Sequence, residues 1–153
     1  MAKHIYVDEH LDNVAKLTKK EDKINYLKQN NVPELKDILR INFDADIVSL
    51  LPEGIPPYRA DDAPRGHENQ RLNREYRKFQ YFLKGPVGSQ TQPMKRERMF
   101  IDLLESLHAK EAEVLVLAKD KKLKYKGITG KLVSDAYPGL IRKKITGGRK
   151  KKD

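Results

Sequence analysis

Apolar residues recur every three or four positions along much of the chain, the spacing at which side chains share one face of an α-helix. In the N-terminal third, Asp8 is placed to cap a first helix and Pro33 suits the first turn of a third. The apolar faces of these three helices are Leu11, Val14 and Leu17, then Ile24 and Leu27, then Leu35, Ile38, Leu39 and Phe43. Residues 45–51 stay apolar up to Pro52 and fit a final helical turn or a short buried strand. We favour the helix because the sequence shows no partner strand.

The same helical spacing of apolar residues continues in the second half of the chain. Residues 71–85 and 95–108 predict two helices, and residues 111–123 predict a third that is apolar on nearly all sides. A buried strand is the alternative for 111–123, but the short spacing from the preceding helix favours a helical hairpin. Thr129 is placed to cap a last short helix that Pro138 and Gly139 end. The inward positions are Leu72, Tyr76, Phe79 and Leu83, then Phe100, Leu103, Leu104 and Leu107, then Leu132, Val133, Ala136 and Tyr137.

Two segments break the helical pattern. Residues 52–70 contain four prolines and two glycines, and residues 86–93 form a second irregular stretch. The longer one is either an ordinary surface loop or a binding loop. Residues 142–153 carry too little apolar surface to fold alone and are expected to be flexible. The sequence therefore predicts one all-α domain over residues 1–141, a compact multi-helix bundle with long irregular loops, followed by a flexible basic tail over 142–153.

Composition narrows the class of protein. The 153 residues contain no cysteine, which excludes disulfides and thiolate metal sites. No run approaches the 18 or so apolar residues that a membrane span needs, and the N-terminus lacks a secretory apolar core. We expect an intracellular protein.

Positive charge is concentrated at the C-terminal end. The formal net charge is +10, and residues 119–153 alone hold 13 Lys and Arg against 3 Asp and Glu. Residues 1–58 and 59–118 are close to neutral, at −2 and +2. A cationic end on a nearly neutral body attracts polyanions. A solvated tail that serves only solubility is the alternative.

Residues suited to catalysis or metal binding are not arranged for it. His4, His10, His67 and His108 are scattered without metal-ligand spacing. The chain has no P-loop, no dinucleotide-binding glycine pattern and no nucleophile elbow. We expect no enzyme activity, no metal and no cofactor.

The stretch "GITG" (127–130), preceded by Lys126, matches a G-x-x-G loop. Such loops let the backbone approach phosphates, and in KH domains they clamp nucleotides. A KH domain also needs flanking strands, which the sequence does not show. The second reading is a turn between two helices that uses glycine for its backbone freedom. Either way, amides at a helix start surrounded by Lys124, Lys126 and Lys131 would suit an anion.

Two segments together carry a family resemblance. "EDKINYLKQNNVPELKDILRINFDADIVSLLP" (21–52) and "VLVLAKDKKLKYKGITGKLVSDAYPGLI" (114–141) resemble the start and end of the N-terminal DNA-binding domain of ATP-dependent DNA ligases of T-even-like phages. The whole chain also resembles small proteins of unassigned function from myoviruses of marine cyanobacteria. The resemblance implies an all-helical domain that grips duplex DNA largely through the DNA backbone and the minor groove. No Asp-Gly pair occurs, so the K-x-D-G motif of a ligase is missing.

The hypothesis is therefore a non-catalytic, largely sequence-independent DNA-binding protein of a phage, located in the host cytoplasm at the nucleoid. Its expected contacts are Lys121, Lys122, Lys124, Lys126, Gly127, Thr129, Gly130, Lys131, Arg142, Lys143, Lys144, Arg149 and Lys150. Arg74, Arg77 and Lys78 are expected as a secondary contact, where Tyr81 or Phe82 would stack on bases or join the core. The alternatives are an adaptor or virion protein that binds a phage replication, transcription or virion partner through 52–70 and 86–93, and an RNA-binding regulator.

Overall fold

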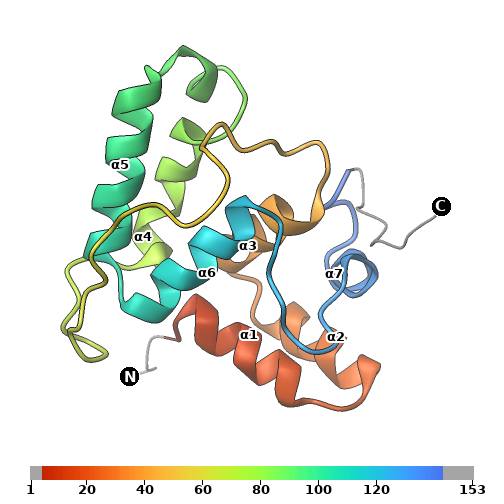
Figure 1. The fold of residues 1–153 in the computed structure, drawn as a ribbon. Helices are drawn as coiled ribbons and strands as arrows, with labels where there is room; N and C mark the ends of the chain where they lie inside the picture. The colour runs from red at the N-terminus through yellow and green to blue at the C-terminus, as the bar shows by residue number, and fades with distance from the viewer. Residues whose placement is uncertain (1–4, 143–153) are drawn as a thin grey trace.

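The computed structural model describes residues 5–142, and over these residues the protein is all-α and compact, with no strand (Figure 1). Isolated bridges pair Ser49 with Leu83 and Asp61 with His108. The α-helices are α1 (Val7–Lys16), α2 (Lys20–Gln29), α3 (Pro33–Phe43), α4 (Leu72–Glu75), α5 (Pro93–Ser106), α6 (Ala109–Lys119) and α7 (Gly130–Ala136), and the 3-10 helices are η1 (Tyr76–Tyr81) and η2 (Gly88–Gln90).

Helix α6 is the centre of the bundle, as its apolar sequence predicts. It packs against α1, α3 and α5. Val114, Leu115 and Val116 are each at most 3% exposed, because neighbouring helices cover α6 on several sides. The inward positions of α5 are also buried, Phe100 and Leu107 among them. The predicted helical hairpin of α5 and α6 is confirmed.

The last helix closes on the second. Helix α7 packs against α2, and its predicted inward residues Leu132, Val133 and Ala136 are buried. The hydroxyl of Tyr137 donates a hydrogen bond of 2.6 Å to the carbonyl oxygen of Leu27. The C-terminal part of the domain therefore covers its N-terminal part.

The start of α1 differs from the prediction. The N-cap residue is Tyr6, and Asp8 lies inside the first turn, where it is 4% exposed. Its carboxylate accepts two hydrogen bonds from the guanidinium of Arg65, at 3.0 and 2.5 Å. The prediction of Asp8 as a cap is wrong. Its carboxylate binds an arginine that is distant in the sequence and does not accept the amides at the start of the helix.

Residues 45–51 do not extend α3, and the helical prediction is wrong here as well. Helix α3 ends at Phe43, and the chain then runs extended beside residues 82–84. The amide of Leu50 donates to the carbonyl of Phe82, and the amide of Lys84 donates to the carbonyl of Val48, both at 2.8 Å. The partner segment is hidden in the sequence because its own pattern predicts the end of a helix.

The predicted helix over 71–85 is broken. Four residues of α4 are followed by the tighter η1, and the chain from Phe82 is no longer helical. Pairing with residues 48–50 pulls residues 82–84 out of the helix. Phe82 is 3% exposed and packs edge-on to Phe100, with ring centroids 5.2 Å apart. This ring belongs to the core and is not available to stack on bases.

Candidate nucleic-acid interface

Residues 120–129, here called the lysine loop, join α6 to α7. The loop starts with a left-handed turn, in which Lys121 has a φ of 59°. The amide of Lys121 donates to the carbonyl of Ala118, and that of Lys122 donates to the carbonyl of Leu117, both at 2.9 Å. This is the Schellman arrangement, which ends a helix and usually has glycine in the left-handed position.

Lys121 occupies that position because its side chain stabilises another helix. Its Nζ donates to the carbonyls of Ile41 and Asp44 at 2.6 and 2.8 Å, at the C-terminal end of α3. Burial lowers the pKa of this lysine. The ammonium faces inward, so we leave Lys121 out of the proposed contact surface.

The same end of α3 holds the loop at two further points. The buried side chain of Asn42 accepts a hydrogen bond of 3.0 Å from the amide of Leu123. Asp44, which is fully buried, accepts one of 3.0 Å from the amide of Arg142. The first half of the lysine loop and the end of the described chain are therefore fixed to one place.

Gly127 has a structural role that explains its residue type. Its φ is +74°, and a Cβ built on it would lie 2.8 Å from Cε of Lys23. The ammonium of Lys23 donates in turn to the carbonyls of Val14 and Leu17 at the end of α1. Glycine lets the loop lie directly on this buried lysine, which favours the reading of "GITG" as a turn between helices.

Thr129 is the cap that the sequence predicts. Its hydroxyl accepts the amide of Leu132 at 3.1 Å, and Gly130 is buried at the first position of α7. The hydroxyl thus accepts a hydrogen bond from one of the backbone amides at the start of α7, so this amide is not available to bind an anion. The seven-residue helix leaves the lysines as the stronger source of positive potential.

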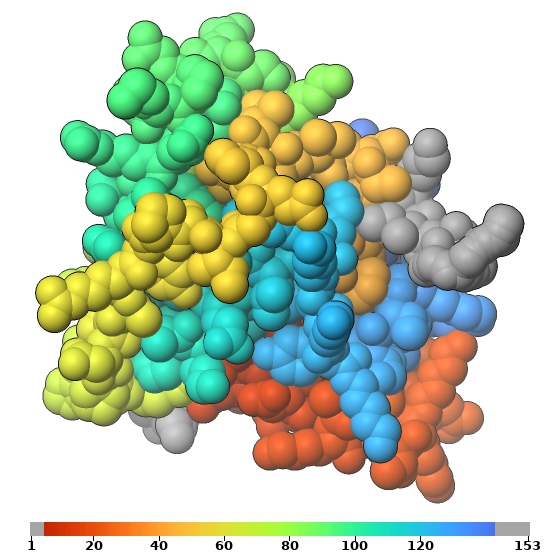
Figure 2. Space-filling view, viewed as in Figure 1, coloured from red at the N-terminus to blue at the C-terminus, as the bar shows by residue number. Residues whose placement is uncertain are grey.

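Lysine side chains on and next to the loop remain exposed. In Figure 2 the loop crosses the surface from the end of α6 to the edge of α1 and α2. The carboxylate of Glu53 and the ammonium of Lys122 form an ion pair of 3.1 Å, and both side chains are exposed. Among the residues that the structure describes, Lys124 and Lys126 take part in no ion pair. The exposed cations on the loop and on α7 are Lys122, Lys124, Lys126 and Lys131, and Arg142 at the end of the described chain is exposed as well.

The structure adds Lys20, which the sequence did not indicate. Lys20 and Lys131 share the carboxylate of Asp135 at 2.9 and 3.5 Å. They line an open pocket of about 290 Å³ together with Thr18 and Thr129. The hydrogen bond from Lys20 is the main reason that the pKa of Asp135 is lowered. Only the packing of α2 on α7 brings Lys20 here, so no local sequence pattern could have placed it.

The predicted secondary contact does not join this surface. In Figure 1, α3 and α6 lie between α4 and α7. Arg74 and Arg77 line different pockets, and the guanidinium of Arg77 lies 5.7 Å from the ring centroid of Tyr76. Lys78 pairs with Glu75 at 2.6 Å. The row of cations is split into three separate environments.

The remaining predicted contacts, Lys143, Lys144, Arg149 and Lys150, lie outside the described residues. Residues 5–142 carry 25 Lys and Arg against 21 Asp and Glu, a formal net charge of +4. The described residues therefore hold only a small excess of positive charge, and carboxylates also lie near the loop, since burial, helped by Asp12 and Glu113, raises the pKa of Tyr125.

Comparison with known proteins gives one family. Residues 10–125 match the model of a family of unknown function, DUF6433. The chain belongs to this family. The DUF6433 match spans most of α1 through α6 and ends inside the lysine loop, before Lys126 and α7. No curated protein matches the chain.

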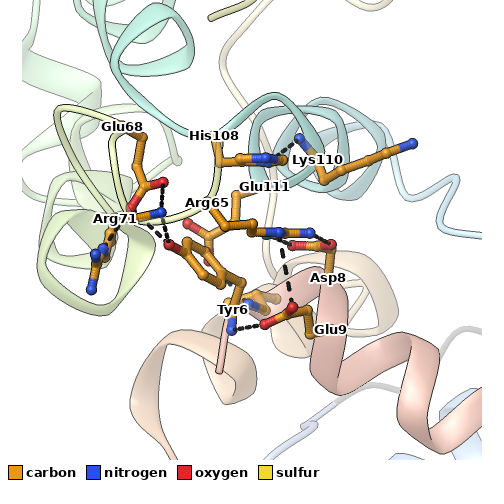
Figure 3. A network of polar contacts seen from close by, with 11 residues as sticks. Tyr6, Asp8, Glu9, Arg65, Glu68, Arg71, His108, Lys110 and Glu111 are labelled. Atoms are coloured by element: carbon orange, nitrogen blue, oxygen red, sulfur yellow. Dashed lines mark hydrogen bonds and ion pairs between the residues drawn. The ribbon is translucent and has the colours of Figure 1, made fainter. Parts of the chain in front are cut away.

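A separate polar cluster fastens loop 59–71 to the start of α1 (Figure 3). The hydroxyl of Tyr6 donates to Glu68 at 2.8 Å, and Arg71 donates to the same carboxylate at 2.6 Å. Burial opposes ionisation of Glu68, but the hydrogen bonds from Arg71 and Tyr6 lower its pKa to about 2. The guanidinium of Arg65 lies 4.4 Å from the centroid of the Tyr6 ring. These side chains use their hydrogen-bonding groups on one another, which is typical of a structural network. We call this cluster of Tyr6, Arg65, Glu68 and Arg71 the latch.

Glu111 lies at the base of this latch. Its side chain is fully buried, and its two oxygens accept the amides of Val7 at 2.9 Å and Leu72 at 3.0 Å. Burial raises its pKa to about 7. One carboxylate thus stabilises the first residues of both α1 and α4, which leaves neither oxygen directed at an open site.

Residues 5–142 offer no basis for a membrane span or a metal centre. No helix there is long and apolar enough to cross a bilayer. The same residues contain no group of three His, Asp or Glu side chains that could hold a metal ion.

Proposed function

We propose that this DUF6433 protein is a non-catalytic DNA-binding protein whose lysine loop contacts the phosphates of duplex DNA. The observation that carries the proposal is a run of exposed cations, Lys122, Lys124 and Lys126, on a backbone that is fixed at both ends. A loop that is already ordered loses less conformational entropy when it binds. More of the attraction between its charges and a phosphate backbone therefore remains as binding free energy.

Lysine sets the expected kind of recognition. An ammonium on a flexible stem behaves as a point charge, whereas base reading relies mainly on side chains with fixed donor and acceptor geometry, such as Arg, Asn and Gln, placed in a groove. Contacts to phosphate position a protein on DNA but carry no sequence information. We therefore expect binding that depends weakly on sequence and strongly on salt.

The likeness to the ligase N-terminal domain supports the same function. The two segments of this chain that carry the likeness, 21–52 and 114–141, are far apart in the sequence. In the fold, α2 packs on α7 and α3 packs on α6. Lys121 and Leu123 tie the second segment to the end of α3. The residues that resemble the phage ligase domain thus form one continuous unit that includes the lysine loop. Without a K-x-D-G motif, this unit would grip DNA without joining it.

The test is binding of duplex DNA over a salt series. Contact with about six phosphates gives a slope of log K on log salt of about −5. The variant Lys124→Glu/Lys126→Glu should bind several-fold to a hundred-fold more weakly at low salt, with a shallower slope. The control Lys84→Glu/Lys95→Glu makes the same charge change at two other exposed positions and should bind nearly as well as wild type.

Equal loss in both double variants would show that only the total charge matters and would overturn the lysine loop as the contact surface. Duplex binding that does not change with salt would also contradict the proposal. Competition with double-stranded RNA separates DNA binding from the RNA-binding alternative.

An adaptor role is the second candidate, and Ile55 favours it. This side chain is 78% exposed, on a segment whose backbone is fixed because Lys119 donates to the carbonyls of Pro52 and Gly54. Ile55 also borders a cavity of about 210 Å³ lined by Leu51, Phe100 and Ile101 among others, and a fixed loop beside such an apolar hollow suits contact with a phage replication, transcription or virion protein. A nuclease-resistant, stoichiometric partner that is lost in Ile55→Asp would favour this role over DNA binding.

A further inference from the structure

A cavity of about 440 Å³ lies between α3 and η1. Its walls are mostly apolar, with Ile41, Ile47, Phe79 and Leu83 contributing. This volume lies in the range of small-molecule sites, which are lined mainly by apolar side chains with a few polar groups for orientation.

The polar groups of the cavity make no hydrogen bond to other described residues. Asp37, Arg40, Arg77 and Gln80 all line it. Asp37 lies close enough to Arg40 for their charges to attract, and the guanidinium of Arg77 lies 5.7 Å from the centroid of the Tyr76 ring. The buried Nε of Arg40 has no acceptor. A buried donor without a partner is costly, and such groups are rare enough that each one calls for an explanation.

The chemistry of the walls indicates which ligand would satisfy these groups. Arg40 and Arg77 offer forked donors suited to a phosphate, and an arginine also stacks on flat rings. Asp37 can accept hydrogen bonds, and Gln80 can both donate and accept them. The apolar floor with Tyr76 beside it suits a flat heterocycle.

We propose that this cavity binds a nucleotide, with the base on the apolar floor and its phosphate at Arg40 and Arg77. A purely apolar side chain of a partner protein would fill the floor but would leave Asp37 and the Nε of Arg40 without hydrogen bonds. A heterocycle carries N–H donors for the carboxylate, and its phosphate supplies the missing acceptors. The proposal stands on the cavity alone and does not require the lysine loop to bind DNA.

The nucleotide has two possible sources, a free mononucleotide or an unpaired nucleotide in a strand. Calorimetric titration with AMP, GMP, CMP and UMP tests the first source. Titration with a single-stranded DNA of four nucleotides tests the second, and the same strand with abasic sites is its control. Binding in either series supports the site if it requires the base and is lost in the variants below.

The variant Arg77→Gln should weaken binding about tenfold or more, because it removes a charge-assisted contact to the phosphate. Arg74→Gln is the matched control, since it makes the same change three residues away in a residue that lines a different pocket. Asp37→Asn should change the ranking of the four bases. Arg77 is exposed, so its variant is expected to fold.

Three results would overturn the proposal. These are no binding of any mononucleotide or strand at millimolar concentration, equal binding of the abasic strand, or equal losses in Arg77→Gln and Arg74→Gln. The Lys124→Glu/Lys126→Glu variant should bind mononucleotides as wild type does. Failure of this site can therefore be told apart from failure of the DNA-binding proposal.

Discussion

At Gly88, a single hydrogen atom allows two segments of the chain to meet. A Cβ at this position would lie 1.9 Å from the carbonyl oxygen of Leu83 and 2.8 Å from that of Gln80. Both neighbours are backbone atoms, so neither can turn aside. The carbonyl of Gly88 also accepts a hydrogen bond of 2.9 Å from the buried guanidinium of Arg96. Gly88 therefore fixes the turn that leads from η1 into α5.

We predict that Gly88→Ala lowers the free energy of unfolding by about 1–3 kcal/mol or more, because the methyl group must displace backbone. Gly85→Ala is the control, since a Cβ there meets no atom within 4 Å. Urea denaturation followed by circular dichroism compares the two. Similar stability of both variants would show that the turn relaxes freely.

Lys121 separates a structural lysine from a binding one. Lys121→Met keeps the apolar stem of the side chain but leaves the carbonyls of Ile41 and Asp44 without their donor. We expect the free energy of unfolding to fall by about 1–3 kcal/mol. The slope of DNA binding with salt should stay at the wild-type value, and a shallower slope would place this ammonium on DNA after all.

At the scale of elements, Glu111 holds the starts of α1 and α4, and this makes stability depend on pH. Its pKa is about 7 in the folded chain, against 4.5 for an ordinary glutamate. Between these values the folded state binds more protons than the unfolded state. We therefore predict that Glu111 makes the free energy of unfolding fall by about 3 kcal/mol as pH rises from 4.5 to 7.

The variant Glu111→Gln isolates this effect, because burial also raises the pKa of Glu34 and Asp37. Glutamine does not titrate, so its stability should fall less over the same pH range. The variant should also be less stable than wild type near pH 4.5, because its NH2 group cannot accept a hydrogen bond from an amide, whereas both oxygens of a protonated carboxyl still can. Glu113→Gln, at an exposed position on the same helix, should follow the wild-type curve.

Elements with strong local patterns were predictable, and those set by distant partners were not. Val114 to Ala118 are apolar on every side, and that pattern alone identified α6 as central. Residues 48–50 pair with residues 82–84, so each segment was wrongly predicted as helical when taken by itself. Asp8 was misread for a similar reason, since Arg65 lies far away in the sequence.

The candidate site was predictable only in part. Thr129 and the exposed lysines lie on one short segment, where the spacing of residues places them. The roles of Lys121 and Gly127 depend on contacts with α3 and Lys23, which no local pattern reveals. Lys20 reaches the site through the packing of α2 on α7.

For the molecule as a whole, the distribution of charge predicts how binding divides between its parts. Residues 143–153 contribute a formal charge of +5, and the described residues contribute +4. A chain that ends at Arg142 should still bind duplex DNA, with a slope of log K on log salt that is shallower by about 0.9 for each phosphate that the shorter chain cannot reach. Titrations of both chains at several salt concentrations measure this. Complete loss of binding would mean that the folded face contributes little.

The contact of Tyr137 with the carbonyl of Leu27 also affects how the protein is made. A ribosome releases α2 long before it releases α7, so the apolar side of α2 stays uncovered during most of synthesis. Tertiary folding of these helices can finish only when the chain as far as Tyr137 has left the exit tunnel. Nascent chains stalled before Tyr137 should accordingly be cut easily by protease.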